Sequence, residues 1–360
     1  MRIKNNILSI VVLFWNDSEK TIKCLNSIYK QKKINFTLVI VDNNSDKKYS
    51  NKVIKWLKNK KVKIFKTTKE NFNFDFSKYK KKCIYIKNKI NFGCGLGHNP
   101  GYKFCLKHNF KYIARIDNDM ILPTNLMSKL CRRLDNNKDI IAMSPKVMFL
   151  DKPNLIWFRG AKIGNNLKFQ RQCSDYDPGH ADTKKYRGLV KTDSIVGCAS
   201  IMRSKNLKQA GLSDPDFFYG EEDIELSNRL KKTNGNLMVD LDQKIYHAVS
   251  HTIGKNWAKN VYYNYKYRLL LLKKMGTILD KSFGYTSFVI KLFLMMFLSF
   301  KIRYSSKLIP VLYAGLHYLG NKYGDYDRIN YKRVDAFFSE YSKKTSLKDI
   351  FINIKKKNLS

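Results

Sequence analysis

The stretch Lys111-Tyr112-Ile113-Ala114-Arg115-Ile116-Asp117-Asn118-Asp119 indicates which class of fold this chain adopts. A short strand-like run leads directly into two carboxylates separated by one residue, and Leu122-Pro123 then opens a predicted helix. Two carboxylates at one strand end can face the same cation. Mg²⁺ and Mn²⁺ prefer carboxylate oxygens, often alongside substrate phosphates. Because Asp-x-Asp is also common in ordinary turns, the surrounding sequence has to decide between a metal site and a turn.

The first part of the chain alternates between buried strands and amphipathic helices. Continuous apolar, β-branched runs predict strands that are covered on both faces. These expected strands are residues 7–14, 36–41, 62–65, 84–86 and 140–147. Capping residues and helical periodicity predict helices over residues 18–29, 53–57, 102–108 and 124–134, with a glycine-rich turn over 91–101. Such alternation is typical of a doubly wound α/β sheet.

Three polar clusters follow expected strands at the point where each strand ends. They are Asn16-Asp17, Asp42-Asn43 and the Asp117 to Asp119 segment. In doubly wound sheets, ligands bind beyond the carboxyl ends of the strands. We therefore expect the three clusters to line one cleft.

The second half of the chain is less regular. Residues 150–192 have no clear period, and short helices and strands follow up to residue 247, with strands expected over 237–241 and 245–247. From Tyr262 onward the sequence is helical, aromatic and basic. We expect a catalytic domain over 1–260, made of halves 1–135 and 136–260, and a helical, basic C-terminal region over 261–360.

The most apolar segment of the C-terminal region runs from Tyr285 to Phe300 and carries Lys291 in its middle. It is shorter than the about 20 residues that a transmembrane helix needs. Three interpretations remain: a helix that lies in the plane of a membrane surface, a buried core helix, and a true span. The first is favoured because a basic chain surrounds the segment.

The formal net charge of the chain is +40, and only 13 of its 69 basic residues are arginines. Specific recognition of bases and phosphates relies on the planar arginine fork. The lysine excess is spread along the chain, so it fits contact with an anionic membrane surface better than nucleic-acid binding. We expect no nucleic-acid partner.

The seven cysteines have no CxxC spacing and no paired arrangement, which indicates a reduced, cytoplasmic chain. The polar start, Met1 to Asn6, and the short run after it do not resemble a signal peptide. Together with the charge, this predicts a cytoplasmic protein at the inner face of the inner membrane.

The remaining motifs form an ordered series with the carboxylate pair. In chain order the series consists of Ile10-Val11-Val12-Leu13-Phe14-Trp15-Asn16, Val39-Ile40-Val41-Asp42-Asn43-Asn44-Ser45, the segment Asn91 to Gly101, Asp117-Asn118-Asp119, Gly197-Cys198-Ala199 with Met202-Arg203, the segment Phe217 to Leu226, and His247. The series resembles the family 2 glycosyltransferases, particularly bacterial rhamnosyltransferase-like members, over roughly residues 7–275. The resemblance implies a GT-A nucleotide-diphospho-sugar transferase fold, which is a doubly wound mixed sheet, with a C-terminal helical extension.

The resemblance also implies roles for individual residues. Asp42 would contact the base or ribose of a nucleotide sugar. Asp119, with Asp117 nearby, would hold Mn²⁺ or Mg²⁺ on the diphosphate, and His247 would complete the metal shell. A hydrogen-bonded histidine at a strand end is the alternative for His247. The residues that the resemblance places around the nucleotide sugar are Asn16, Asp42, Asn43, Asn91, Gly93, Gly97, Asn99 and Asp117.

Glycosyl transfer also needs a base that takes the proton of the acceptor hydroxyl. The acidic run that starts at Glu221 opens a predicted helix, where the positive end of the helix dipole favours ionised carboxylates. Four carboxylates in five residues exceed what capping requires. Asp223 is the favoured base, Glu222 is the second choice, and Glu225 stands where the family usually has Asp.

These observations predict an inverting, metal-dependent glycosyltransferase. Its acceptor would be a glycan or lipid-linked glycan in bacterial surface polysaccharide synthesis, such as lipopolysaccharide or capsule. One alternative is a nucleotidyltransferase, although Trp15-Asn16-Asp17 stands where that class has a glycine-rich basic loop. Another is a non-catalytic cationic protein that binds nucleic acid or membranes, which leaves the carboxylates without a role. The Gly93-x-Gly-x-Gly pattern lies too far from the first strand for a dinucleotide fingerprint.

Overall fold

The computed structural model describes residues 7–67, 72, 75, 76, 79, 82–163, 179–248, 257–301, 305–324 and 330–344. The contacts between residues divide the described chain into two compact units. The first contains residues up to 163, residues 179–214 and Glu222–Ala248; the second contains Pro215–Glu221 and the described residues from 257 onward. The predicted boundary near residue 260 thus falls inside a helix of the second unit.

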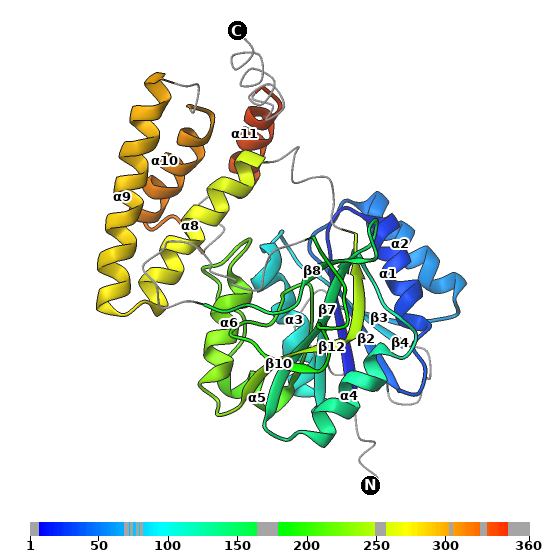
Figure 1. The fold of residues 1–360 in the computed structure, drawn as a ribbon. Coiled ribbons are helices and arrows are strands. Elements are labelled where there is room, and N and C mark those ends of the chain that lie inside the picture. The colour runs from blue at the N-terminus through cyan, green and yellow to red at the C-terminus, as the bar shows by residue number, and fades with distance from the viewer. Residues whose placement is uncertain are drawn as a thin grey trace. The chain divides into compact units, whose positions relative to one another are not determined.

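A mixed β-sheet forms the centre of the first unit (Figure 1). Its strands are β1 (Leu8–Phe14), β2 (Phe36–Asp42), β3 (Lys63–Thr67), β4 (Lys82–Lys87), β5 (Tyr112–Asp117), β6 (Met120–Ile121), β7 (Ile140–Phe149), β8 (Leu155–Phe158), β9 (His180–Ala181), β10 (Leu189–Lys191), β11 (Ala199–Arg203) and β12 (Asn236–His247). The main path runs β10-β12-β7-β11-β5-β1-β2-β4-β3. Strands β1 to β5 pair in parallel, whereas β11 runs antiparallel between β5 and β7.

Helices cover both faces of this sheet. One apolar core joins the sheet to α1 (Ser18–Tyr29), α2 (Lys47–Asn59) and α4 (Leu126–Asn136). A second core joins the opposite face to α3 (Gly93–Lys107), α5 (Ser204–Ala210) and α6 (Glu222–Lys231). Successive residues of β1 alternate between the cores: Ile10 and Val12 face the first, and Val11 faces the second. The predicted doubly wound α/β class is therefore confirmed.

Two local predictions were wrong. The expected glycine-rich turn over 91–101 is mostly helix, because α3 already begins at Gly93, which has a φ of +75°. A Cβ on Gly101 would lie 2.6 Å from Cγ1 of Val11, so the glycines let α3 pack closely on β1. The strands expected at 237–241 and 245–247 are one strand, β12, with a bulge between Asp240 and Lys244.

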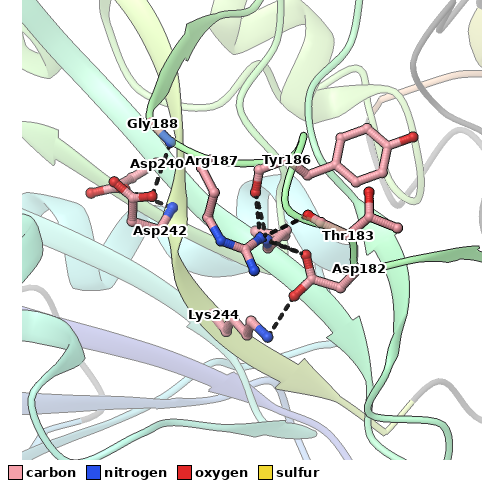
Figure 2. Close-up of polar contacts among 9 residues, drawn as sticks. Asp182, Thr183, Tyr186, Arg187, Gly188, Asp240, Asp242 and Lys244 are labelled. Carbon is pink, nitrogen blue, oxygen red and sulfur yellow. Dashed lines mark hydrogen bonds and ion pairs between the residues drawn. The ribbon is translucent and has the colours of Figure 1, made fainter.

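A polar network holds the bulged part of β12 in place (Figure 2). The buried carboxylate of Asp182 accepts hydrogen bonds from Nζ of Lys146 at 2.6 Å and from Nη1 of Arg187 at 2.9 Å. Nζ of Lys244 lies 2.5 Å from its other oxygen. These three cations lower the pKa of Asp182 to about 2, against the effect of burial. Beyond the bulge, β12 continues to His247 at the carboxyl edge of the sheet.

The second unit consists of α8 (Trp257–Met275), α9 (Ile278–Lys301), α10 (Ser305–Leu319), α11 (Tyr331–Lys344) and Pro215–Glu221. The predicted helical C-terminal region is confirmed. A fully buried lysine, Lys266, lies in its aromatic core. The Nζ of Lys266 lies 4.6 to 5.3 Å from the ring centroids of Tyr262, Tyr263, Tyr267 and Tyr331, and it makes no hydrogen bond within the described part of the chain.

Helix α9 covers the apolar segment 285–300. One face packs on α8 and α10 through Phe288, Leu292 and Met295. Apolar residues also occupy the solvent-exposed side; they are Ile278, Leu279, Phe283, Val289, Ile290, Phe293, Leu294, Met296 and Phe297, called here the α9 stripe. Within the part of the chain that the structure describes, no helix is both long and apolar enough to cross a bilayer.

Candidate active site

The three polar clusters meet at the carboxyl edge of the sheet. In the parallel register, Asp42 pairs with Phe14 and Asp117 pairs with Leu13, so β1, β2 and β5 end at the same level. The chain leaves β1 toward β2 on one side and returns from β4 to β5 on the other, which makes the β1–β5 boundary a topological switch point. Ligands bind at such points in open α/β sheets. The predicted convergence of these clusters on one edge is confirmed.

Asp42 shapes the turn after β2 rather than reaching solvent. Its side chain is fully buried. It accepts hydrogen bonds from the backbone N–H of Ser45 at 2.7 Å and from the hydroxyls of Ser50 and Tyr85, each at 2.6 Å. Asn16, with a φ of +51°, accepts a hydrogen bond from the backbone N–H of Asp46 at 2.8 Å and so ties the end of β1 to this turn.

Asn43 and Asn91 join this turn to the start of α3. Nδ2 of Asn43 donates to Oδ1 of Asn91 at 2.7 Å and to the carbonyl of Gly93 at 3.0 Å. Oδ1 of Asn43 accepts from Nδ2 of Asn88 at 2.9 Å and from the backbone N–H of Phe92 at 3.1 Å. These contacts leave Asn43 with few free hydrogen-bonding positions. These predicted nucleotide-binding residues thus hold one another in place at the carboxyl edge of the sheet.

Two further residues of the predicted set lie along α3. A Cβ on Gly97 would lie 3.0 Å from Nδ2 of Asn43, so this glycine allows the helix to approach the turn. Asn99 is buried and exchanges two hydrogen bonds with the backbone of Ser213, at 2.9 and 3.0 Å. Asn99 therefore anchors α3 to the segment that follows α5.

The structure brings Asp119 and His247 together from distant parts of the sequence. Oδ1 of Asp119 lies 3.2 Å from Nε2 of His247. The antiparallel pairing of β12 with β6, in which His247 faces Met120, produces this approach. Two ligands of one octahedral Mg²⁺, each at 2.0–2.1 Å, are about 3 Å apart, so this pair fits a shared cation. Within the described residues no group of three His, Cys, Asp or Glu side chains is close enough to hold a metal by itself.

Asp117 is the last residue of β5 and faces a buried histidine. Its Oδ1 is 3.9 Å from Nε2 of His98, which is fully buried and whose Nδ1 lies 2.6 Å from the carbonyl of Cys94. Burial raises the pKa of Asp117 to about 7; Arg115 lowers it and Asp119 raises it. Burial and Arg115 lower the pKa of His98, which keeps the imidazole neutral.

The acidic run opens α6 beside the same strand. Oδ2 of Asp223 accepts a hydrogen bond from the backbone N–H of Gly197 at 3.2 Å, just before β11. Glu222 is buried, and its Oε1 accepts a hydrogen bond from Nη2 of Arg115 at 2.9 Å. Glu225 instead accepts two hydrogen bonds from Arg229, each 2.6 Å, on the same helix. Asp223 is therefore the most accessible member of the acidic run within the first unit.

Sequence reasoning missed two residues of this site, Arg115 and His98. A signal existed only for Arg115, since a charged residue stands in the middle of the apolar strand Tyr112–Asp117. His98 lies near the site through tertiary packing, which no local pattern encodes. Trp157 on β8 packs edge-on against the ring of His247, with centroids 4.8 Å apart.

The doubly wound mixed sheet, with paired carboxylates at its switch point, is the architecture expected of the GT-A nucleotide-sugar transferases. The sequence model of the family described as Glycosyl transferase family 2 matches residues 9–208, more than half of the chain. The chain belongs to this family. The resemblance to the family 2 glycosyltransferases is confirmed, and family membership favours glycosyl transfer over the nucleotidyltransferase and the non-catalytic binding protein.

Individual relatives are more distant. The "Uncharacterized glycosyltransferase MJ1057" of Methanocaldococcus jannaschii is 27% identical over 147 residues, which are 41% of this chain and 43% of that protein. The crystal structure of GalNAc-T7 with UDP, GalNAc and Mn²⁺ superposes with a TM-score of 0.50 at 14% identity, over 74% of this chain and 51% of that one. The crystal structure of S. aureus TarS gives a TM-score of 0.47 at 13% identity, over 74% and 39%. This chain thus spans less than half of MJ1057 and TarS, and the GalNAc-T7 match supports the fold.

Proposed function

We propose that this glycosyltransferase transfers a sugar from a nucleoside diphosphate sugar with inversion at the anomeric carbon, and that it depends on Mn²⁺ or Mg²⁺. The observation that carries the proposal is the 3.2 Å approach of Asp119 and His247 at the carboxyl edge of the sheet. A carboxylate suits either cation, and the imidazole nitrogen beside it supplies a second ligand atom. The related fold of GalNAc-T7 was solved with UDP and Mn²⁺, which supports a nucleoside diphosphate and a divalent cation here.

Asp119, His247 and Asp117 are the residues that would hold the cation. When bound, the cation neutralises charge that develops on the departing diphosphate. The protein supplies only part of a coordination shell, so we expect oxygens of the donor diphosphate to supply ligands as well. Metal and nucleotide should then bind together rather than independently.

Asp223 is the proposed base. The acceptor O–H gives its proton to the Asp223 carboxylate while its oxygen attacks the anomeric carbon. The bond between that carbon and the diphosphate oxygen breaks on the opposite face, and the leaving nucleoside diphosphate takes the electron pair. The hydrogen bond from the backbone N–H of Gly197 fixes the position of Oδ2 of Asp223. Attack opposite the leaving group inverts the anomeric configuration.

We further propose that the acceptor is a glycan or lipid-linked glycan of bacterial surface polysaccharide, reached at an anionic membrane surface. The polysaccharide role rests on the sequence resemblance. The membrane contact rests on the α9 stripe, whose Phe293 and Phe297 side chains are 67% and 61% exposed. Large contiguous apolar surfaces mark contact sites. The net charge of +40 favours an anionic bilayer as the surface that contacts the α9 stripe.

Thermal unfolding with nucleoside diphosphates tests the core of the proposal. UDP, GDP and dTDP are added separately, with and without Mn²⁺, to the intact chain and to Asp119→Ala. A ligand that binds only the folded state raises the unfolding midpoint. We expect one nucleotide to raise it only when Mn²⁺ is present, and Asp119→Ala to abolish the shift. A shift that survives in Asp119→Ala contradicts the metal assignment, and no shift with any nucleotide contradicts the proposed donor class.

A further inference from the structure

We propose that Arg115 and Glu222 form a positioning pair that fixes the start of α6, and with it Asp223, against the strand that carries Asp117. The inference rests on the proposed function, in which Asp223 is the base. The pair joins two elements that are 107 residues apart in sequence. In this proposal Arg115 and Glu222 act by positioning Asp223 and do not themselves touch the reacting atoms.

The pair is buried and directional. Nη2 of Arg115 and Oε1 of Glu222 are 2.9 Å apart, and the two side chains are only 3% and 8% exposed. Arg115 stands two positions before Asp117 on β5, so its side chain leaves the same face of the strand as Asp117. A hydrogen-bonded ion pair at this place fixes the distance between the strand and the first turn of α6.

Gly197 lies between Arg115 and Asp223. Its backbone N–H holds Asp223, while a Cβ built on it would lie 3.0 Å from Nη2 of Arg115 and 3.4 Å from Cβ of Asp223. The next residues enter β11, where Ser200 pairs with Arg115. The guanidinium, the glycine and the proposed base therefore form one layer supported by two paired strands.

Stability alone does not explain such a pair. Replacement of a buried ion pair by apolar residues is often neutral or stabilising, because both charges must be desolvated. Helix α6 already has apolar anchors, Leu226 and Leu230, in the second core. Two other ion pairs of α6, Glu225 with Arg229 and Lys231 with Asp193, do not reach β5. The Arg115–Glu222 pair thus ties the first turn of α6 to β5.

The test uses release of nucleoside diphosphate from UDP-glucose, UDP-N-acetylglucosamine and GDP-mannose with Mn²⁺ and water as acceptor. Arg115→Met and Glu222→Gln should each lower kcat about tenfold or more, with less than a twofold change in the KM of the donor, because a small misplacement of the base is costly. The double variant should be no slower than the slower single variant, since both residues act through one contact. Arg115→Lys should restore part of the rate.

Matched variants separate positioning from general damage. Glu225→Gln removes the other buried carboxylate of α6 and should leave kcat within about twofold of the parent chain. Additive losses in the Arg115→Met and Glu222→Gln double variant, or equal losses in Glu225→Gln, overturn the inference. If Asp223→Asn is as active as the parent, the proposed function fails instead. If only Asp223→Asn is inactive, the proposed function stands and the positioning pair does not.

A second measurement needs no substrate. Hydrogen–deuterium exchange of the backbone amides of residues 225–227 should become about tenfold faster in Arg115→Met, because local opening of the first turn becomes easier. The amides of α1 should not change. In Glu225→Gln the same amides should stay within about twofold of the parent. Unchanged exchange in Arg115→Met overturns the inference whatever the donor sugar is.

Discussion

Oδ1 of Asp119 and Nε2 of His247 lie 3.2 Å apart, although Asp119 follows β5 and His247 ends β12, the last strand of the sheet in sequence. Strand β12 brings them together because it pairs with β7 along its length and with β6 at its end. The approach is close enough for one cation to bind both side chains. His247 thus places a further side chain that can bind a cation beside the carboxylate pair, Asp117 and Asp119.

His247→Ala should abolish the Mn²⁺-dependent part of nucleotide binding and lower transfer at least about tenfold, since a direct metal ligand is lost. The measurement is the unfolding midpoint with the nucleotide that stabilises the parent chain, with and without Mn²⁺. His180→Ala is the matched control, because His180 is exposed on β9. A normal Mn²⁺-dependent shift of the unfolding midpoint in His247→Ala would favour the alternative role of His247, that of a hydrogen-bonded histidine at a strand end.

Asp223→Asn should retain nucleotide binding and lose about 10²- to 10⁴-fold in transfer, because the amide cannot accept the proton of the acceptor. The substitution keeps the shape of the side chain and an oxygen for the backbone N–H of Gly197. Kinetics and thermal shift are measured on the same preparation. Turnover near the parent value would reject Asp223 as base and turn attention to Glu222.

The α9 stripe should bind vesicles that contain phosphatidylglycerol and should not bind vesicles of phosphatidylcholine alone, since the chain is strongly cationic. Phe293→Ser with Phe297→Ser should weaken the binding at least about tenfold through lost apolar burial. Flotation at low salt measures the bound fraction. Ile7→Ser with Leu150→Ser removes exposed apolar side chains of the first unit and serves as the control. Equal binding by both double variants would exclude the α9 stripe as the contact.

Asp182→Asn should lower the free energy of unfolding by about 3 kcal/mol, because Lys146 would remain buried without its counterion. The pKa of Asp182 is lowered to about 2 from 3.8, so the carboxylate stabilises the fold above about pH 4. This contribution, about 2 kcal/mol, is lost as the pH falls toward 2.

Urea unfolding at pH 7 and pH 3 measures the effect of Asp182→Asn. The difference between the parent and Asp182→Asn should shrink at the lower pH. Lys231→Met breaks the exposed pair of Lys231 with Asp193 and should change stability by less than about 1 kcal/mol. A small effect at both pH values in Asp182→Asn would mean that the network does not hold β12.

Lys266→Met should stabilise the second unit most strongly at low pH. Burial lowers the pKa of Lys266 to about 7 from 10.5, although Asp335 raises it in part. Between pH 7 and 10.5 the unfolded chain binds more protons, so the free energy of unfolding rises with pH. Below about pH 7 the folded state carries the whole cost of a buried ammonium.

Thermal unfolding of the intact chain at pH 6 and pH 10 measures the effect of Lys266→Met. We expect the substitution to raise the midpoint by about 4 °C or more at pH 6 and by much less at pH 10. Lys332→Met, on the exposed side of α11, is the control and should change neither value. A lower midpoint in Lys266→Met at pH 6 would mean that the four tyrosine rings stabilise the charged ammonium by more than its desolvation costs.

The sequence was sufficient to predict the class of fold and the edge of the β-sheet at which the candidate site lies. Apolar runs such as Ile7 to Phe14 predicted β1 because burial on both faces leaves a continuous apolar signal. The polar residues after β1, β2 and β5 then had to meet, because parallel strands end at one edge. The glycines after Asn91 were misjudged, since their close packing against β1 depends on the sheet below them.

The sequence by itself determined which residues stand at strand ends, because apolar periodicity and strand termini are local properties of the chain. Only the tertiary structure decided which of them face one another. The full set of hydrogen bonds on Asp42, the pairing of Arg115 with Glu222 and the approach of His247 to Asp119 all depend on strand order and on packing between distant segments. Those contacts arise from the sum of many burial and pairing energies, which no single stretch of sequence encodes.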